Sequence, residues 1–224
     1  PFDGYIAGAY ISTDNGLSWN SAGLSSDWVT AFAINGNNLF AGTFDHGVYF
    51  SSNNGTNWTQ ILPINTWIYS LYANGSNLYA GYYNGIYYTS NNGVNWTDIS
   101  SGLPFNPFPE VWAINSMGPY LFAGTRYGIF RSSNNGTNWT LSHASKWVRA
   151  FAIIGTYLFA GTDSNLYRSS DNGDTWTNVS NGLPDLHVRS LIANGTYLFA
   201  GTDANPCRST DNGASWTIVN RGLK

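Results

Sequence analysis

The feature that most constrains the fold is an octapeptide that occurs six times. It reads Ser/Thr-x-Asp/Asn-Asn-Gly-x-x-Trp, and its copies occupy residues 12–19, 51–58, 89–96, 132–139, 169–176 and 209–216. The glycines of successive copies are 39, 38, 43, 37 and 40 residues apart. A period near 40 residues indicates a repeat architecture in which each unit is one supersecondary structure. The chain is therefore an array of similar units.

Each unit contains four short segments with the composition of β-strands. In the second of the six repeats they are 28–36, 38–43, 47–52 and the stretch that begins at Trp58, and later repeats contain the same segments. These segments are β-branched or aromatic, are bounded by Gly, Asn or Asp, and show no helical period. Four antiparallel strands in about 40 residues are typical of a propeller blade, which neighbouring blades must cover.

We therefore predict an all-β fold, a β-propeller of six blades with four antiparallel strands each and an incomplete first blade. The whole chain, residues 1–224, forms one domain in this prediction. Its units lie at about 1–26 (partial), 27–65, 66–108, 109–145, 146–185 and 186–224.

The octapeptide is predicted to be the turn between the third and fourth strands. Asn-Gly favours a tight hairpin because both residues tolerate positive φ, and the residue before it can accept backbone N–H groups. That acceptor is a carboxylate in three units and an amide in the other three: Asp14, Asp171, Asp211, Asn53, Asn91 and Asn134. A metal or catalytic role would need the charge in every copy, so the motif is predicted to be structural. The tryptophans that end it are predicted to be apolar plugs: Trp19, Trp58, Trp96, Trp139, Trp176 and Trp216.

The first unit is shorter than the others, with eleven residues before its octapeptide. Half a blade leaves unpaired strand edges. We expect that the chain is cut from a longer one, or that another segment or a second subunit completes this blade.

The pattern Ser-x-Asp-x-Gly-x-x-Trp resembles the Asp box, the bacterial neuraminidase repeat. This repeat is found in sialidases, sortilin-type receptors, some xyloglucan-cleaving glycosidases and a photosystem II assembly factor. The resemblance spans all six units and implies the propeller fold. It says little about activity, because function depends on sites added to a fold.

The resemblance to sialidases implies an arginine triad, a Tyr–Glu nucleophile pair and an acidic Asp, and this chain matches that set poorly. It has one glutamate, Glu110, and Arg131, Arg168 and Arg208 occupy equivalent places in three units, as repeated surface residues would. The carboxylates that a glycosidase would need across the scissile bond could come from Asp45, Glu110, Asp163 and Asp203. We predict no catalytic residues, and keep a glycoside hydrolase fragment as an alternative.

Composition excludes several partners. Charged residues are 9% of the chain and the net charge is −3, with no basic cluster, so nucleic acid is excluded as a partner. No apolar run is long enough for a membrane helix. The single cysteine, Cys207, excludes a disulfide framework and is expected in a small core position. No cofactor and no metal are predicted, and the low charge suggests an extracellular or periplasmic protein.

A binding site is expected where the units differ from one another. In a propeller, the entry of the first strand and the loop between the second and third strands open on one axial face. The predicted site consists of the variable residues at these places: Trp28, Trp67, Glu110, Trp147, His187, Tyr69, Trp112, Arg149, Arg189, Asp45, Tyr83, Arg126, Asp163 and Asp203. Aromatic platforms with nearby polar groups suit sugar rings or a peptide. We expect these positions to meet solvent, because a buried unpaired Glu110 would be costly.

The sequence thus predicts a secreted, non-catalytic propeller that binds carbohydrate or protein at its axial face. The alternatives are a sialidase-like or other glycoside hydrolase fragment and a protein-assembly factor. A glycan-binding module predicts exposed aromatic side chains, a protein scaffold predicts a broad flat patch, and an enzyme predicts two facing carboxylates.

Overall fold

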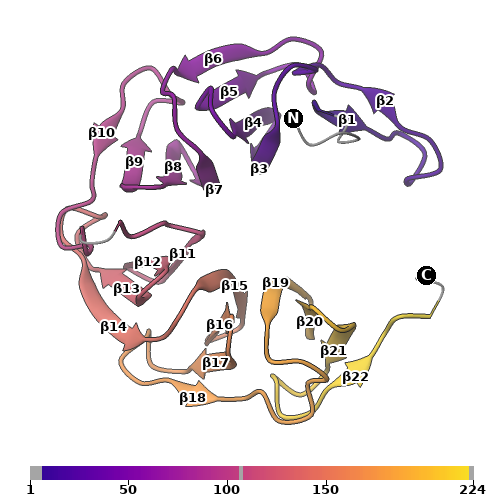
Figure 1. Ribbon diagram of the computed structural model, residues 1–224, viewed down its shortest axis with the longest axis vertical. Helices are drawn as coiled ribbons and strands as arrows, with labels where there is room; N and C mark the ends of the chain where they lie inside the picture. The colour runs from indigo at the N-terminus through magenta and orange to yellow at the C-terminus, as the bar shows by residue number, and fades with distance from the viewer. Residues whose placement is uncertain (1–6, 106–107, 222–224) are drawn as a thin grey trace. The chain divides into compact units, whose positions relative to one another are not determined.

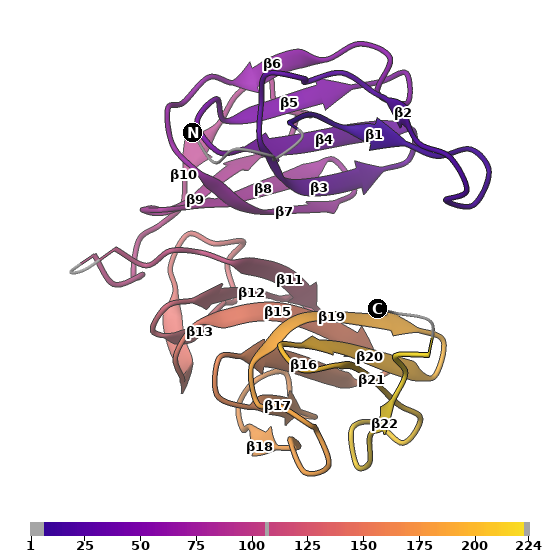
Figure 2. The same ribbon diagram turned by 45° about the vertical axis from the view of Figure 1, so that its right-hand side comes forward.

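The computed structural model describes residues 7–105 and 108–221. These residues form 22 strands in six antiparallel sheets (Figures 1 and 2). Within the described ranges, no helix has the length and apolar character needed to cross a membrane. The first six residues of the predicted partial unit lie outside the described residues.

The chain divides into two compact units, residues 1–98 and 99–224. The first unit holds three sheets: β1 (Tyr10–Ile11) and β2 (Asn20–Ser21); β3 (Val29–Asn35), β4 (Asn38–Thr43), β5 (Val48–Ser51) and β6 (Thr59–Leu62); β7 (Ile68–Asn74), β8 (Asn77–Tyr82), β9 (Gly85–Thr89) and β10 (Thr97–Asp98). Each four-stranded sheet is a simple meander, as a propeller blade requires.

The second unit holds three four-stranded meanders: β11 (Ala113–Met117), β12 (Tyr120–Thr125), β13 (Gly128–Ser132) and β14 (Thr140–Ala144); β15 (Val148–Ile154), β16 (Tyr157–Thr162), β17 (Leu166–Ser169) and β18 (Thr177–Asn178); β19 (Val188–Asn194), β20 (Tyr197–Thr202), β21 (Pro206–Ser209) and β22 (Thr217–Ile218). The predicted fold class is confirmed, with five four-stranded blades and a two-stranded first sheet. The second predicted strand of each unit agrees with the observed one, as at 38–43.

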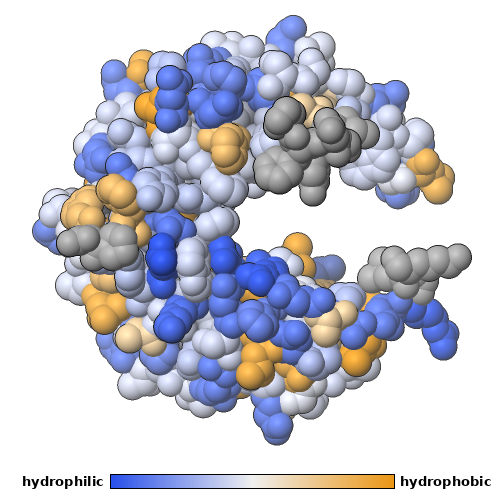
Figure 3. Space-filling view, viewed as in Figure 1, coloured by the Kyte–Doolittle hydropathy of each residue, from blue (hydrophilic) through white to orange (hydrophobic). Residues whose placement is uncertain are grey.

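Within each compact unit, apolar side chains fill the space between successive blades. Phe122 of β12 packs with Val148, Phe151 and Leu158 of the next sheet, and all four are buried. The close approach of the next blade explains why the repeated sequence Ala-Gly-Thr contains a glycine. A Cβ at Gly161 would lie 2.6 Å from the Val188 side chain of the next blade. Polar side chains cover most of the face seen in Figure 3, with apolar ones in small groups.

The octapeptide forms the predicted turn. At Asn54–Gly55 both residues have positive φ, 54° and 81°, and the other five copies repeat this geometry. In the fifth copy, Asp171 Oδ1 accepts the backbone N–H of Thr175 (2.9 Å) and the hydroxyl of Ser169 (2.8 Å). The turn is therefore held by the geometry that both Asp and Asn can supply.

The tryptophan of each turn reaches back to the preceding blade. The indole Nε1 of Trp58, Trp96 and Trp216 donates to the carbonyls of Ala22, Ile61 and Val179. Within the second unit, Trp139 Nε1 donates to Ile99 O and Trp176 Nε1 to Ser142 Oγ. Trp19 departs from the predicted plug role and is exposed.

Candidate functional site

A β-bulge at the entry of the first strand sets the direction of the site side chains. In four blades the register shifts across one residue, for example between Val148 and Ala150, so that Arg149 has no direct partner on β16. Thr30, Tyr69 and Arg189 occupy the same bulged place in their blades. Bulges commonly turn a side chain toward a binding region, and the alignment of the repeats did not reveal this one.

In the first unit, the site positions form an aromatic row made of Trp28, Phe44, Trp67 and Tyr69. Consecutive ring centroids lie 5.6, 4.9 and 4.7 Å apart. Trp28 is 39% exposed and Phe44 is 38% exposed. The row therefore offers apolar ring surface to solvent, as predicted for Trp28. Phe44 was not predicted, although it directly precedes the variable Asp45.

Polar groups border one end of the aromatic row. Asp45, Ser26, Trp28 and Phe44 line a shallow pocket of about 210 Å³. His46 Nδ1 lies 2.6 Å from Asp27 Oδ1 and 3.2 Å from Asp45 Oδ1. Their potential ligand atoms lie within 4.8 Å of one another, which is close enough to share one cation. Asp27 is buried and was not predicted, because its position in the other units carries unrelated residues.

The remaining site residues of this unit follow the same loop. Tyr83 is exposed, whereas the neighbouring Tyr82 is buried and donates to Asp98 Oδ2 at 3.0 Å. Burial, followed by the charge of Asp98, raises the pKa of the Tyr82 phenol. Tyr82 is therefore a packing residue, and Tyr83 belongs to the surface.

In the second unit, six charged residues form an ion-pair ladder: Glu110, Arg126, Arg149, Asp163, Arg189 and Asp203. Glu110 pairs with Arg126 at 3.1 Å, and Arg149 holds Asp163 with two bonds, 3.0 and 3.1 Å. Arg189 bridges Asp163 at 2.8 Å and holds Asp203 with two bonds of 2.8 Å. The ladder is electrically balanced, with three cations and three anions.

Trp112 and Trp147 contact two arginines of the ion-pair ladder. The guanidinium of Arg149 lies 4.2 Å from the ring centroid of Trp112 and 4.7 Å from that of Trp147. Arg126 stacks over Trp147 at 4.7 Å. These distances are typical of cation–π contacts. Arg126 and Arg149 are therefore held by both carboxylates and ring faces.

The structure corrects the expectation for Glu110. Its residue is 8% exposed, and its carboxylate is neutralised by Arg126, whose side chain is 41% exposed. The argument from an unpaired carboxylate therefore fails, because Arg126 removes the cost. Arg149 and Arg189, expected to be available for a ligand, already bind Asp163 and Asp203.

The backbone at the strand entry is strained in this unit. Glu110 and Trp147 occupy equivalent positions and have φ of 48° and 52°. Left-handed backbone is rare for bulky residues and concentrates at functional sites. Trp147 is held there by backbone bonds to Arg126 O (3.1 Å) and from Asp163 N (3.2 Å).

The last predicted site residue, His187, is exposed and bonds to Asp185, with Nδ1 and Oδ1 2.8 Å apart. The backbone N–H of His187 is the main cause that lowers the pKa of Asp185. The Arg189 guanidinium lowers the pKa of Asp203, and this bond raises the pKa of Arg189 in turn. Both shifts favour the charged forms of Arg189 and Asp203.

Comparison with known proteins identifies the repeat. The BNR/Asp-box repeat model matches residues 10–21, which contain the first octapeptide. The chain is a BNR-like propeller built of Asp-box repeats. No curated protein sequence matches this Asp-box propeller.

Solved structures share the fold of this Asp-box propeller at low identity. An ancestral GH74 enzyme is 20% identical with a TM-score of 0.79, covering 96% of this chain and 36% of its own. The extracellular domain of a B. thetaiotaomicron protein is 21% identical with a TM-score of 0.72, covering 89% and 31%. The GH74 xyloglucanase from Xanthomonas campestris is 15% identical with a TM-score of 0.71, covering 96% and 42%. The chain thus spans less than half the length of each of these three proteins.

Proposed function

We propose that this Asp-box propeller is an extracellular, non-catalytic binding module for neutral carbohydrate. The aromatic row carries the proposal. Trp28 and Phe44 expose ring surface beside Asp45, and a small pocket lies between them. Aromatic faces with a few polar groups at the edge suit the alternating apolar and hydroxyl surfaces of sugar rings.

Charge balance favours a neutral ligand over an acidic one. Each arginine of the ion-pair ladder already bonds to a carboxylate. An anionic sugar would have to displace Asp163 or Asp203 from these bonds. The first unit offers the carboxylate of Asp45 beside the rings, and a carboxylate repels an anionic ligand but accepts hydroxyl groups.

The comparisons are consistent with this proposal and limit it. The names of the similar structures include an extracellular domain and a xyloglucanase. Both share only the fold, so the extracellular location and the sugar class are proposals for this chain. Xyloglucan oligosaccharides are the first ligands to test.

The experiment measures binding of soluble xyloglucan oligosaccharides by isothermal titration calorimetry. Trp28→Ala and Phe44→Ala should each weaken binding about tenfold, equivalent to about 1.4 kcal/mol. Trp19→Ala is the matched control, because Trp19 is also exposed but belongs to the turn of the first sheet. Binding should be unchanged between about 0.05 and 0.5 M salt, since screening affects only charged ligands.

Two results would contradict the proposal. The first is equal loss of binding in the Trp19 control, which would indicate nonspecific stickiness. The second is absence of binding to any neutral glycan on an array, together with binding to peptides, which would favour the scaffold alternative.

A glycoside hydrolase is the second candidate, and one observation favours it. Carboxylate oxygens of Asp27 and Asp45 lie within 4.8 Å of each other, near the spacing of about 5 Å in retaining enzymes. Both carboxylates also contact His46, and Asp27 is buried, which argues against this candidate. Release of reducing sugar from xyloglucan that is lost in Asp45→Asn would establish this candidate and reject the non-catalytic proposal.

A further inference from the structure

The dipeptide Asn-Gly occurs eleven times in the chain, six times inside the octapeptide and five times elsewhere. This dipeptide is chemically labile. The backbone nitrogen of the glycine attacks the side-chain carbonyl carbon of the asparagine, ammonia leaves, and a cyclic succinimide forms. Water then opens the ring to aspartate or to isoaspartate, whose main chain runs through the former side chain. Because glycine has no Cβ, its backbone reaches the geometry of attack easily. The reaction therefore depends on whether the fold restrains the glycine nitrogen.

In every Asp box, the glycine N–H is bound by the hydroxyl that begins the motif. The Ser or Thr oxygen accepts this N–H at 2.7 to 3.1 Å in all six copies. In the fifth copy, Ser169 Oγ accepts the N–H of Gly173 at 2.8 Å and donates its own hydrogen to Asp171 Oδ1 at 2.8 Å. The hydroxyl therefore uses both its donor and its acceptor capacity. Attack by the glycine nitrogen requires this bond to break.

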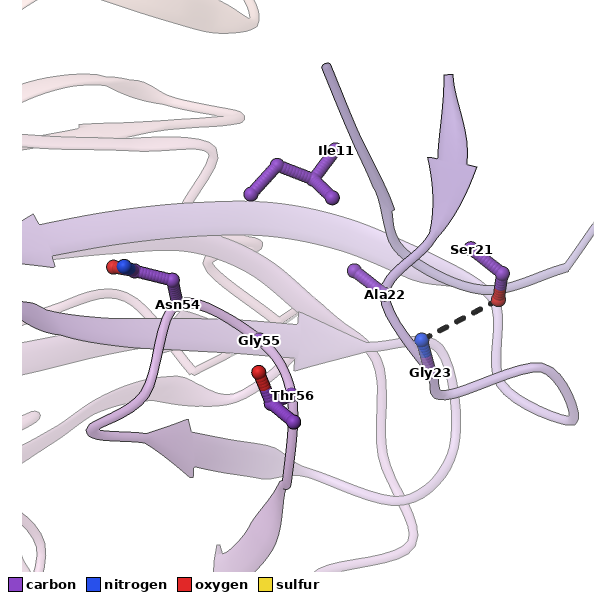
Figure 4. A pocket seen from close by; sticks show the side chains of 7 residues that line it. All are labelled: Ile11, Ser21, Ala22, Gly23, Asn54, Gly55 and Thr56. Carbon is purple, nitrogen blue, oxygen red and sulfur yellow. Dashed lines mark hydrogen bonds between the residues drawn. The ribbon is translucent and has the colours of Figure 1, made fainter. Parts of the chain in front are cut away.

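The asparagine side chain of the box is also directed away from the nitrogen. Figure 4 shows the side chain of Asn54 pointing away from Gly55. Both residues have positive φ, 54° and 81°, and Ser51 Oγ accepts the Gly55 N–H at 2.9 Å. The turn would have to open before the two reacting atoms could meet. The Asn-Gly pairs of the boxes should therefore react slowly.

Two Asn-Gly pairs outside the octapeptides lack these restraints. Asn181–Gly182 lies in the turn that follows β18, and Asn194–Gly195 lies where β19 ends, and all four residues are exposed. In the part of the chain that the structure describes, neither glycine N–H has a hydrogen-bond acceptor and neither asparagine side chain has a partner. Nothing has to break before these nitrogens can move onto the side chain.

A third pair is a matched comparison. Asn35–Gly36 has the same hairpin position in its blade as Asn194–Gly195, at the end of the first strand. However, Asn35 Nδ2 donates to the carbonyl of Gly75 in the next blade. This bond restrains the amide group whose carbon is attacked. Asn35 should therefore react more slowly than Asn194.

We propose that Asn181 and Asn194 are the sites at which this chain converts spontaneously to isoaspartate, and that the first hydroxyl of each Asp box protects the Asn-Gly pair within it. The hydroxyl then has a chemical role in addition to shaping the turn. At Asn194 the conversion adds one negative charge and inserts one carbon atom into the main chain. Asn194 pairs with Tyr197 across a two-residue loop, and hairpin register depends on loop length. The conversion should therefore loosen the pairing of β19 with β20.

The test follows each site by mass spectrometry. The folded chain is produced in a host that does not glycosylate Asn-x-Ser/Thr sequences, incubated in mildly alkaline water labelled with heavy oxygen, and digested in ordinary water. Only sites that react before digestion carry the label. Asn181 and Asn194 should react about tenfold faster than Asn54 and Asn172, with Asn35 between them. In urea these sites should react at similar rates, because the dipeptide is the same.

Variants separate the hydroxyl bond from general loosening of the turn. Ser169→Ala should accelerate the reaction at Asn172 about fivefold, equivalent to about 1 kcal/mol, because one hydrogen bond is lost. Ser169→Thr should keep it slow, since Thr89 makes the same bond in the third copy at 3.1 Å. Trp176→Phe is the control. It removes the bond from the Trp176 indole to Ser142 Oγ but leaves the hydroxyl in place, so Asn172 should stay slow.

Three outcomes would overturn the proposal. The first is reaction at Asn54 and Asn172 in the folded chain as fast as at Asn181 and Asn194. The second is an unchanged rate at Asn172 in Ser169→Ala. The third is equal acceleration in Trp176→Phe and Ser169→Ala, which would assign the protection to turn stability alone. None of these measurements depends on a glycan, so the carbohydrate proposal stands or falls separately.

Discussion

At the scale of single residues, the Asp box contains a correlation that explains why two different acceptors occur. Where the acceptor is Asp, the residue four positions later is Ser18, Thr175 or Ser215, and its hydroxyl donates to the carboxylate at 2.5 to 2.6 Å. Where the acceptor is Asn, that later residue is also Asn. The second carboxylate oxygen of each Asp thus has a hydroxyl donor four residues later. Asn has no second carboxylate oxygen, and no hydroxyl follows it at that position.

This pairing predicts a pH dependence. The hydroxyl of Thr175, followed by its backbone N–H, lowers the pKa of Asp171 from 3.8 to about 2. A group with a lowered folded pKa stabilises the fold above its unfolded pKa and loses that effect as pH falls toward the folded value. Asp171→Asn should therefore change stability at pH 7 by less than about 1 kcal/mol. Its stability should fall less than that of the wild type between pH 4 and pH 2, as urea unfolding would measure. Identical acid profiles would contradict the assigned bond.

Two glycines of the same motif separate backbone strain from crowding. Gly16 and Gly93 have φ of 86° and 90°, but a Cβ at Gly16 meets nothing within 4 Å and one at Gly93 lies 2.3 Å from Ile61 Cδ1. Gly16→Ala should cost about 1–2 kcal/mol from strain alone. Gly93→Ala should cost about 1–3 kcal/mol more, from overpacking. Equal losses in chemical denaturation would show that Ile61 moves aside freely.

At the scale of strands and loops, the ion-pair ladder has an unequal distribution of burial. Asp163 is 20% exposed and is shared by Arg149 and Arg189, whereas Asp203 is 43% exposed and serves Arg189 alone. Asp163→Ala should therefore destabilise the fold by about 1–2 kcal/mol, and Asp203→Ala by less than about 1 kcal/mol. A double-mutant cycle on Arg149 and Asp163 would measure the coupling. A coupling energy of zero would show that the ion pair between Arg149 and Asp163 does not contribute to stability.

The sequence predicts the strands well and the site only in outline. The second strand, 38–43, agrees with β4 because Gly and Asn mark both ends and every repeat confirms them. The positions of Trp28 and Tyr83 at the surface followed from the same alignment. Phe44 was missed although it directly follows the second strand, as the predicted Tyr83 does, and Asp27 was missed because its position in the other repeats carries unrelated residues. The pairing of Glu110 with Arg126 was missed because it joins two loops whose separation only the fold determines.

At the scale of the whole molecule, equivalent residues should differ in energetic weight according to their neighbours. Trp176 and Trp216 donate to the preceding blade, but Trp19 is exposed. Replacement by phenylalanine keeps a ring and removes the donor. Trp176→Phe and Trp216→Phe should each cost about 1 kcal/mol, and Trp19→Phe should cost almost nothing. Equal thermal shifts at the three positions would contradict nearest-neighbour stabilisation.

The backward reach of these tryptophans has a consequence for synthesis of the chain. Each indole in the later blades bonds to an atom made 34 to 40 residues earlier. A blade leaving the ribosome therefore always finds its docking surface already present, and it never waits for a segment that has yet to be translated. Arg131 and Arg168 instead donate to the turn carbonyls of Asn172 and Asn212 in the next blade. These bonds can form only after the next blade has been synthesised. The array can assemble vectorially, one unit at a time, in the direction in which it is made.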